Sequence, residues 1–320
     1  MTQLGTDRTP ANARRAIARM AGLAGALVIL AACGSSEGGD SAASGVSIPT
    51  QDVVSVVQVN DAARALLPDV DRKNSTVSIA IDTVEGTARL PLAGLNSEGN
   101  EVGLSKDIRD AVGKALGLTW DVQEGTFATI IPGVQSGRYQ LGMSNFGVTK
   151  DRIKVVDFAT YLKDGQSFVG SAQAPVTSVR EISDVCGLKI ATGSGTTFQK
   201  ILDNGKTQCA AKGKPVYEVQ YFADNAPIFT GLQKGTIDAY FGPTLALTVL
   251  PTRLTGTRYL GEISKTPVGI VTPKGSAFAP AIQSAINGLI SNGQYAAIFK
   301  KWGVPDSAVP RSEINPDPGF

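Results

Sequence analysis

Between residues 77 and 301 the chain alternates short apolar runs with longer segments of helical periodicity, which restricts the folds open to it. Strands are predicted at 77–81, 118–122, 141–144, 188–191, 216–220 and 239–241. Helices are predicted at 104–116, 127–135, from 197 onward, and at 226–234, 279–291 and 295–301. Strands that alternate with helices are typical of an α/β fold with mainly parallel sheets. We expect the proline-containing stretch after Val304 to be poorly ordered.

The first 32 residues have the character of an export signal. Arginines at positions 8, 14, 15 and 19 form a basic start, and an apolar, uncharged run covers 20–32. This run is shorter than the roughly 20 residues that a membrane-spanning helix needs. The sequence LAAC at 30–33 looks like a lipobox, which predicts cleavage before Cys33 and attachment of a diacylglycerol to its thiol. A plain secretory signal cut near Ala32, with Cys33 left as a free thiol, is the alternative.

The composition that follows Cys33 fits a membrane anchor. Residues 34–45 are mostly Gly, Ser and Ala, which predicts a flexible tether with nothing to bury. We therefore assign 1–32 to a signal peptide, 33–50 to the lipidated cysteine and its tether, and 51–69 to an N-terminal extension. The mature protein is expected outside the cytoplasm, anchored to the cell membrane by its lipid.

The cysteine count agrees with an exported protein. If Cys33 carries a lipid, the remaining cysteines are Cys186 and Cys209, an even pair in an oxidising compartment. We predict that these two form a disulfide bond. Two buried free thiols are the alternative.

The composition also excludes several classes of function. The chain contains no histidine, which rules out Ser-His-Asp and Cys-His hydrolases and every metal site ligated by histidine. Thirty basic and 28 acidic residues nearly balance, and no basic stripe with interleaved aromatic side chains indicates a nucleic-acid partner. There is no P-loop and no glycine fingerprint after a strand. These absences favour a binding protein with no cofactor and no metal, while an enzyme that works with carboxylates, Lys or Tyr alone stays open.

Seven short stretches of sequence occur in a fixed order in the region 77–304. They are VGLSKDI at 102–108, FATIIP at 127–132 with VQSGRY at 134–139, VTKDRIKVVDF at 148–158, GTT at 195–197, LQKGTIDA at 232–239, NGQY at 292–295 and KWG at 301–303. Taken together they resemble the bacterial extracellular solute-binding proteins of family 3, which are the polar amino-acid-binding components of ABC importers.

The resemblance implies a two-lobed periplasmic-binding-protein-like fold of type II, with a ligand cleft between two α/β lobes and a hinge of two strands. We place lobe 1 at 70–170 and 269–304, lobe 2 at 171–268, and a C-terminal tail at 305–320. The hinge crossings are expected at 167–170 and 267–270. Cys186 and Cys209 then both fall within lobe 2, where their bond would brace that lobe without hindering closure.

The resemblance also implies which residues bind the ligand. Arg152 matches the arginine that grips the ligand's carboxylate, a task that suits the planar fork of a guanidinium. Thr196 and Thr197 follow a predicted strand and open a helix, and the free N–H groups at such a junction attract anions. One carboxylate held by both lobes would keep them closed. The alternatives are a solvated arginine and an ordinary capping turn.

Three weaker candidates complete the expected site. Phe127 occupies the position of an aromatic residue that lines the cleft in the family, although a phenylalanine at a helix start is often part of a core. Asp82 ends the first strand, at the carboxyl edge where open α/β sheets bind ligands, and would meet a positive group of the solute unless it is merely solvated. Ser144 ends the strand that leads into the Arg152 segment.

Two positions depart from the family pattern. Members that bind α-amino acids usually hold the ammonium group with a Ser or Thr and with an Asp, and here Gly147 and Pro243 take those places. Neither offers a side-chain acceptor, and a buried ammonium without an anionic partner costs several kcal/mol. Either the ammonium is met elsewhere, with Asp82 and Glu85 as candidates, or the solute lacks it. An alignment displaced by one residue would bring Thr244 into the site.

The function that this pattern predicts is capture of a small carboxylate-bearing solute, an amino acid or a related compound, for an ABC permease with its cytoplasmic ATPase. We expect a monomer, tied to the membrane by its lipid, that is not an enzyme. One alternative is a ligand-sensing lipoprotein that acts in trans. The other is a periplasmic dehydratase on the same fold, with Glu85, Glu98 or Glu124 as the general acid.

Overall fold

The computed structural model describes residues 47–82 and 84–318. They belong to one compact unit, Ser44–Phe320. The predicted signal peptide and Cys33 lie outside the described residues, so their assignment stays a prediction. Within the described ranges no helix is long and apolar enough to cross a membrane.

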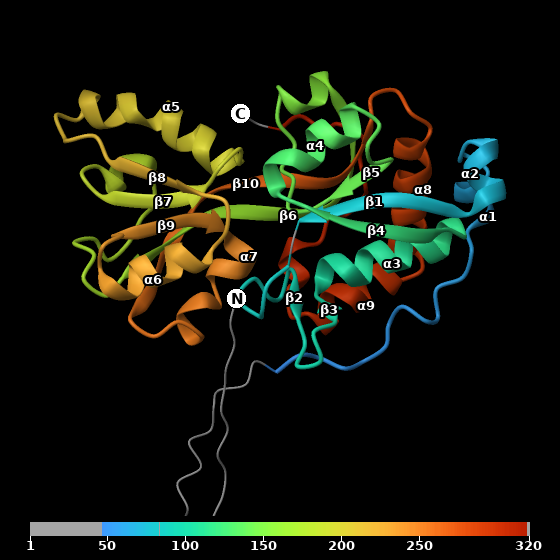
Figure 1. Cartoon of the computed structure of the whole chain (residues 1–320), viewed down its shortest axis with the longest axis horizontal. Helices are drawn as coiled ribbons and strands as arrows, with labels where there is room; N and C mark the ends of the chain where they lie inside the picture. Colours follow the sequence, from blue (N-terminus) through green and yellow to red (C-terminus); the bar gives the residue numbers. More distant parts are fainter. Residues whose placement is uncertain (1–46, 83, 319–320) are drawn as a thin grey trace, which may run out of the picture. The chain divides into compact units, whose positions relative to one another are not determined.

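The described chain forms an α/β structure in which helices cover a mixed sheet (Figure 1). The strands are β1 (Thr76–Asp82), β2 (Gly94–Leu95), β3 (Glu101–Val102), β4 (Thr119–Gly125), β5 (Leu141–Met143), β6 (Val156–Ser171), β7 (Lys189–Gly193), β8 (Glu218–Phe222), β9 (Ala239–Pro243) and β10 (Thr257–Pro273). The α-helices are α1 (Asp61–Arg64), α2 (Asp69–Asn74), α3 (Leu104–Leu116), α4 (Phe127–Gln135), α5 (Thr197–Ala211), α6 (Ala226–Lys234), α7 (Thr244–Leu247), α8 (Phe278–Ser291) and α9 (Gln294–Lys301). Short 3-10 helices are η1 (Arg152–Lys154), η2 (Ile182–Val185), η3 (Leu250–Thr252) and η4 (Pro305–Ser307).

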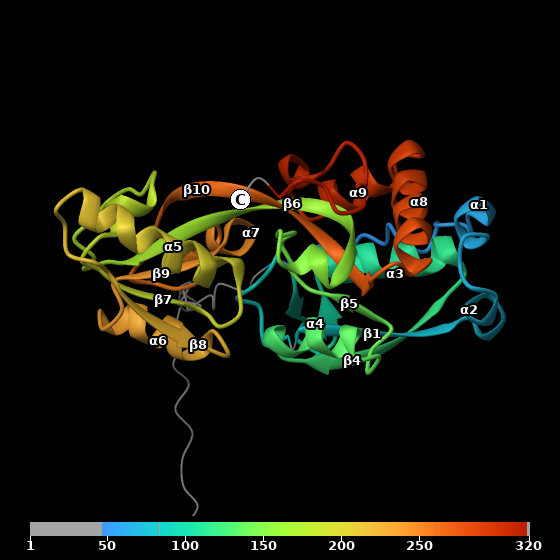
Figure 2. The same ribbon diagram turned by 90° about the horizontal axis from the view of Figure 1, so that it is seen from above.

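Two long strands join two sets of parallel strands. The large sheet has the order β4-β1-β5-β10-β6-β9-β7-β8, in which β6 and β10 are antiparallel partners along almost their whole length. Strands β1, β4 and β5 lie on one side of this ribbon and β7, β8 and β9 on the other, as Figures 1 and 2 show. We call the half with β1 lobe 1 and the half with β7 lobe 2.

Each lobe has a hydrophobic core of its own. In lobe 1 the core is formed by β1, β5, α3, α8 and α9, and Val53 and Val57 of the N-terminal extension pack into it. In lobe 2 a core around β7, β9 and α5 contains the stacked rings of Phe168 and Phe241. The sequence-based prediction of a two-lobed α/β fold is therefore confirmed.

Helix α3 shows why the local predictions succeed. Its apolar side chains at Leu104, Ile108, Val112 and Leu116 are all buried against lobe 1, as their spacing predicts. Gly117 ends the helix in the left-handed conformation (φ +64°), which is unstrained only for glycine. The predicted bounds, 104–116, match the structure.

The hinge is longer than the sequence suggests. The predicted crossing segments 167–170 and 267–270 lie inside β6 and β10, but the structure extends each strand to 16 and 17 residues respectively. Strand β9 pairs with β6 from Gln166 to Gly170, while β5 pairs with β10 at Val271. The change from one lobe to the other therefore falls within the two strands. The residue boundaries that we give to the lobes stay predictions.

The predicted disulfide is present. Cys186, directly after η2, bonds to Cys209 in α5 with an Sγ–Sγ distance of 2.03 Å. Both cysteines pack in the lobe 2 core. The bond therefore ties α5 to the segment that leads into β7.

The expectation of a poorly ordered C-terminal stretch is wrong. The backbone N–H of Thr160 donates to the carbonyl of Glu313 (3.0 Å), and Ala159 forms an antiparallel bridge with Ile314. The side chain of Asn315 accepts from the N–H of Phe158 (2.9 Å). These bonds form because the lobe 1 half of β6 has β10 on only one side, which leaves its other edge open to pairing.

Candidate functional site

The side chain of Arg152 lies where lobe 1 meets lobe 2. It begins η1, and its guanidinium carbon is 5.6 Å from the ring centre of Phe127 and 5.8 Å from that of Phe146. One terminal nitrogen, Nη1, donates to the carbonyl of Gly147 in lobe 1 (2.9 Å), and Nη2 donates to the carbonyl of Gly195 in lobe 2 (3.1 Å). The two aromatic rings and two carbonyls thus fix the plane of the guanidinium between the lobes.

The partners of this guanidinium are neutral. Among the described residues no Asp or Glu forms an ion pair with Arg152, whereas its neighbours Asp151 and Lys154 pair with each other. Burial lowers the pKa of Arg152 to about 10, which still leaves the group charged at neutral pH. A partly desolvated cation without a counter-ion favours an anionic ligand.

The start of α5 supplies the lobe 2 side of this cluster. Thr196 is its N-cap: the hydroxyl accepts from the N–H of Gln199 (3.2 Å) and donates to the carbonyl of Gly193 (2.7 Å). The hydroxyl is thus used within the helix start, and the groups left for a ligand are the first backbone N–H groups of the helix. Lys200, one turn further along α5, pairs with Asp151 of lobe 1.

Gly147 and Thr197 face each other across the two lobes. A Cβ atom built on Gly147 would lie 3.2 Å from the Cγ2 methyl of Thr197 and 3.1 Å from that of Thr266. The space in which the family places a hydroxyl is therefore bordered by two methyl groups. A methyl group does not accept a hydrogen bond from an ammonium group.

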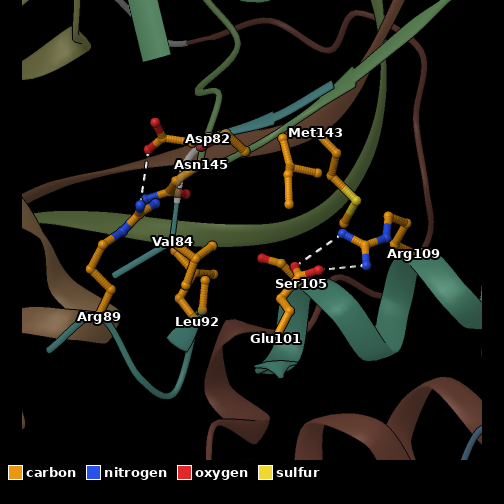
Figure 3. Close-up of a pocket in the computed structure, with 12 residues that line it drawn as sticks. Asp82, Val84, Arg89, Leu92, Glu101, Ser105, Arg109, Met143 and Asn145 are labelled. Carbon is orange, nitrogen blue, oxygen red and sulfur yellow. Dashed lines mark hydrogen bonds and ion pairs between the residues drawn. The ribbon is translucent and has the colours of Figure 1, made fainter. Parts of the chain in front are cut away.

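A second group of the predicted residues surrounds a small cavity in lobe 1 (Figure 3). Asp82 and Ser144 line it, together with Arg89 and Asn145. Asp82 forms an ion pair with Arg89, in which the Nη1 to Oδ2 distance is 3.0 Å. Burial raises the pKa of the Asp82 carboxyl above its ordinary value, although Arg89 acts in the opposite direction.

Two uncharged buried polar atoms beside this cavity have no hydrogen-bond partner among the described residues: Ser144 Oγ and Asn145 Oδ1. The amide nitrogen of Asn145 donates to Asp164 (2.7 Å), and the carbonyl of Ser144 accepts from the Tyr161 hydroxyl (3.2 Å). Buried polar atoms without partners are rare in proteins. The two atoms are therefore available to a bound molecule.

Three charged residues near these side chains are not among the candidates that the sequence patterns indicate. Asp164 is buried in β6 and accepts from the N–H groups of Gly165 (2.8 Å) and Leu245 (3.0 Å), and burial raises its pKa to about 6. Arg253 of lobe 2 donates through Nη1 to the carbonyls of Thr87 (3.0 Å) and Leu90 (2.7 Å) in lobe 1. Arg89 is the third. Of the three, only Asp164 has a local signal, since it is followed by glycine shortly after the largely apolar stretch 158–162.

The structure brings the remaining candidates together only in part. Asp82 pairs in register with Gly125 of β4, two residues before Phe127, which links the Arg152 cluster to the cavity. Pro243 lies at the end of β9 opposite Gln166, and the neighbouring Thr244 contacts the hydroxyl of Ser167 rather than Arg152 or Asp82.

The three glutamates considered as general acids are all exposed: Glu85, Glu98 and Glu124. A carboxylic acid that donates a proton near neutral pH normally needs a buried environment. Their positions do not provide one.

The sequence of the chain matches that of a known protein family. Residues 84–305 match the bacterial extracellular solute-binding proteins, family 3. The chain therefore belongs to that family and is a solute-binding protein of the two-lobed type.

Individual relatives agree with this assignment. The ABC transporter glutamine-binding protein GlnH of Bacillus subtilis is 28% identical over 291 residues, which cover 88% of this chain and 95% of the relative. The arginine-binding protein ArgT of Corynebacterium glutamicum is 28% identical over 235 residues, or 70% of this chain and 74% of that protein. A solved structure of an ancestral arginine-binding protein bound to arginine is 25% identical, with a TM-score of 0.61 over 71% of this chain and 98% of that chain.

Proposed function

We propose that the protein captures a small carboxylate-bearing solute, an amino acid or a related compound, and delivers it to the permease of an ABC importer. The observation that carries the proposal is the guanidinium of Arg152, which hydrogen-bonds to both lobes and has only neutral partners among the described residues. Relatives that bind glutamine and arginine support the solute class.

The mechanism that we infer follows from those contacts. A carboxylate competes with the carbonyls of Gly147 and Gly195 for the guanidinium and offers charge-assisted hydrogen bonds, which are stronger. Its second oxygen accepts from the first N–H groups of α5 in lobe 2. The solute thus adds a bond between the lobes that exists only when they are closed, and it shifts the population toward the closed form. The permease then distinguishes the loaded protein by that form.

The deciding experiment is a thermal-shift screen of the protein without residues 1–33. The panel pairs α-amino acids with their deaminated acids and their amides. A solute at 100 times its Kd stabilises by ~2.7 kcal/mol, which raises the Tm by several degrees. We expect carboxylates to stabilise and their amides not to. A panel in which no carboxylate raises the Tm contradicts the proposal.

The same screen tests the consequence of Gly147 and Pro243. The methyl groups that face Gly147 offer nothing to an ammonium group, so deaminated acids are expected to stabilise as well as the amino acids do. A response confined to amino acids indicates instead that another carboxylate receives the ammonium. Asp164 and Asp82 are then the residues to replace first.

We further propose that the protein is a lipoprotein acting as a monomer at the outer face of the cell membrane, through a lipid on Cys33. The Cys33→Ser variant is expected to leave the membrane fraction and appear in the soluble fraction, since it cannot accept the diacylglycerol. Fractionation of expressing cells followed by immunoblotting measures this. The variant Cys186→Ala/Cys209→Ala, which keeps Cys33, is the matched control and should stay with the membrane. If Cys33→Ser also stays there, the anchor is not this cysteine.

A further inference from the structure

The segment between β1 and β2 turns a positively charged side chain back toward the end of β1. Its residue Arg89 pairs with Asp82, and the two side chains are only 18% and 20% exposed. In Figure 3 the guanidinium of Arg89 points at the carboxylate of Asp82, and both residues line the cavity. The carboxylate at the end of the first strand is thus already engaged by a cation of the same chain.

This segment is held in place from both sides. Its Leu90 and Leu92 are buried in the lobe 1 core, and Arg253 of lobe 2 bonds to the carbonyls of Thr87 and Leu90 on either side of Arg89. These bonds fix the backbone on both sides of Arg89, and pre-organisation of the backbone lowers the entropy cost of forming a contact. The backbone position from which Arg89 reaches Asp82 is therefore set by the segment itself.

The ion pair lies next to the proposed carboxylate site. Phe127 connects the two, because it lies two residues after Gly125, the register partner of Asp82 in the parallel pair β1–β4, while its ring lies against the guanidinium of Arg152. A solute that is held at Arg152 by its carboxylate therefore has the Asp82–Arg89 pair within reach of the rest of its structure. The cavity beside the pair also has two uncharged atoms in need of hydrogen bonds, Ser144 Oγ and Asn145 Oδ1.

We propose that Arg89 takes the place of a ligand cation at Asp82, so that the solute is one whose side chain is uncharged. The inference rests on the proposed function and narrows its solute class. A cationic side chain in this place would compete with Arg89 for one carboxylate and would lie beside a like charge, both of which disfavour it. An uncharged polar side chain instead satisfies Ser144 and Asn145. Resemblance to arginine-binding proteins therefore does not extend to the solute.

Isothermal titration calorimetry with matched ligands tests the proposal. The wild-type protein is expected to bind citrulline or glutamine and to bind arginine and lysine at least roughly tenfold more weakly. In Arg89→Ala the carboxylate of Asp82 loses its partner, and the affinity for arginine should rise roughly tenfold or more relative to the affinity for citrulline. Arg89→Lys keeps the positive charge and should, like the wild type, bind arginine and lysine more weakly than citrulline. The double variant Arg89→Ala/Asp82→Asn should not show this increase in arginine affinity, because the carboxylate is removed.

Two results would overturn the inference: a wild-type protein that prefers arginine to citrulline, or an Arg89→Ala variant that folds, as its melting curve shows, and gains nothing for arginine. The comparison of arginine with citrulline in the wild-type protein tests the inference even if the variant does not fold.

A separate measurement keeps this inference distinct from the proposed function. If no carboxylated solute binds at all, the proposed function fails, and methylguanidinium still reports on Asp82. A rise in Tm with methylguanidinium in Arg89→Ala, absent from the wild type and the double variant, supports the internal cation. An equal response of all three proteins contradicts it.

Discussion

Replacing Arg152 with alanine is expected to weaken solute binding by at least ~2 kcal/mol, about a thirtyfold increase in Kd. The guanidinium is partly desolvated between Phe127 and Phe146, so removing it leaves the carboxylate of the solute without its main counter-charge. Arg152→Lys retains the charge but not the forked guanidinium that reaches both Gly147 and Gly195. Its Kd should therefore fall between those of the wild type and the alanine variant. Titration calorimetry measures all three.

Lys150 provides the matched control for that experiment. It lies two residues before Arg152, carries the same charge and is exposed. Lys150→Ala should therefore change the Kd little, because an exposed charge is screened by solvent. If Arg152→Ala binds the solute as tightly as Lys150→Ala does, Arg152 is not part of the site.

Loss of the disulfide is expected to have the largest effect on stability. The bond joins residues 23 apart in sequence. In the chain-entropy description its removal gives the unfolded chain more conformational freedom and lowers the free energy of unfolding by about 3 kcal/mol. Cys186→Ala/Cys209→Ala should therefore unfold at a lower denaturant concentration, with a slope that is no smaller, because the unfolded chain without the bond exposes at least as much surface. Chemical denaturation measures both. Alanine is chosen because Cys209 is fully buried and a serine there would add an unpaired hydroxyl.

Solute affinity separates this effect from the binding site. Thr196 and Thr197 start α5, whereas Cys209 lies near its far end, so the Kd of the folded double variant should stay close to that of the wild type. Reductant should destabilise the wild-type protein and leave the double variant unchanged. Equal stability of wild type and variant in the absence of reductant would show that the bond does not stabilise lobe 2.

The elements that can be predicted from the sequence are those that local patterns define. The spacing of Leu104, Ile108, Val112 and Leu116 and the glycine at 117 define α3 without reference to any other element. Strand β6 was recognised only in part, because Lys163, Asp164 and Gly165 interrupt its apolar run. These residues lie between the section that pairs with lobe 1 and the section that pairs with β9, where a strand is not obliged to be apolar.

The candidate site divides in the same way. Arg152 and Thr196 were found because short stretches of sequence around them resemble the family. Arg89 and Arg253 were missed because their partners are defined only in three dimensions: Arg253 contacts carbonyls more than 160 residues away in the chain. The capping bonds of the Thr196 hydroxyl follow from the sequence, since threonine before a helix is a common N-cap. The closeness of the methyl groups of Thr197 and Thr266 to Gly147 does not follow from the sequence, because it depends on the folded structure.

The C-terminal segment that pairs with β6 has a consequence for how the protein behaves in concentrated solution. Without residues 313–315, the lobe 1 half of β6 would present a row of unpaired N–H and C=O groups, next to the buried apolar side chains of Phe158 and Ala159. Exposed strand edges of that kind act as templates for pairing between chains. The segment therefore protects against self-association, and a protease that trims it, or a shortened expression product, would yield a molecule prone to aggregate.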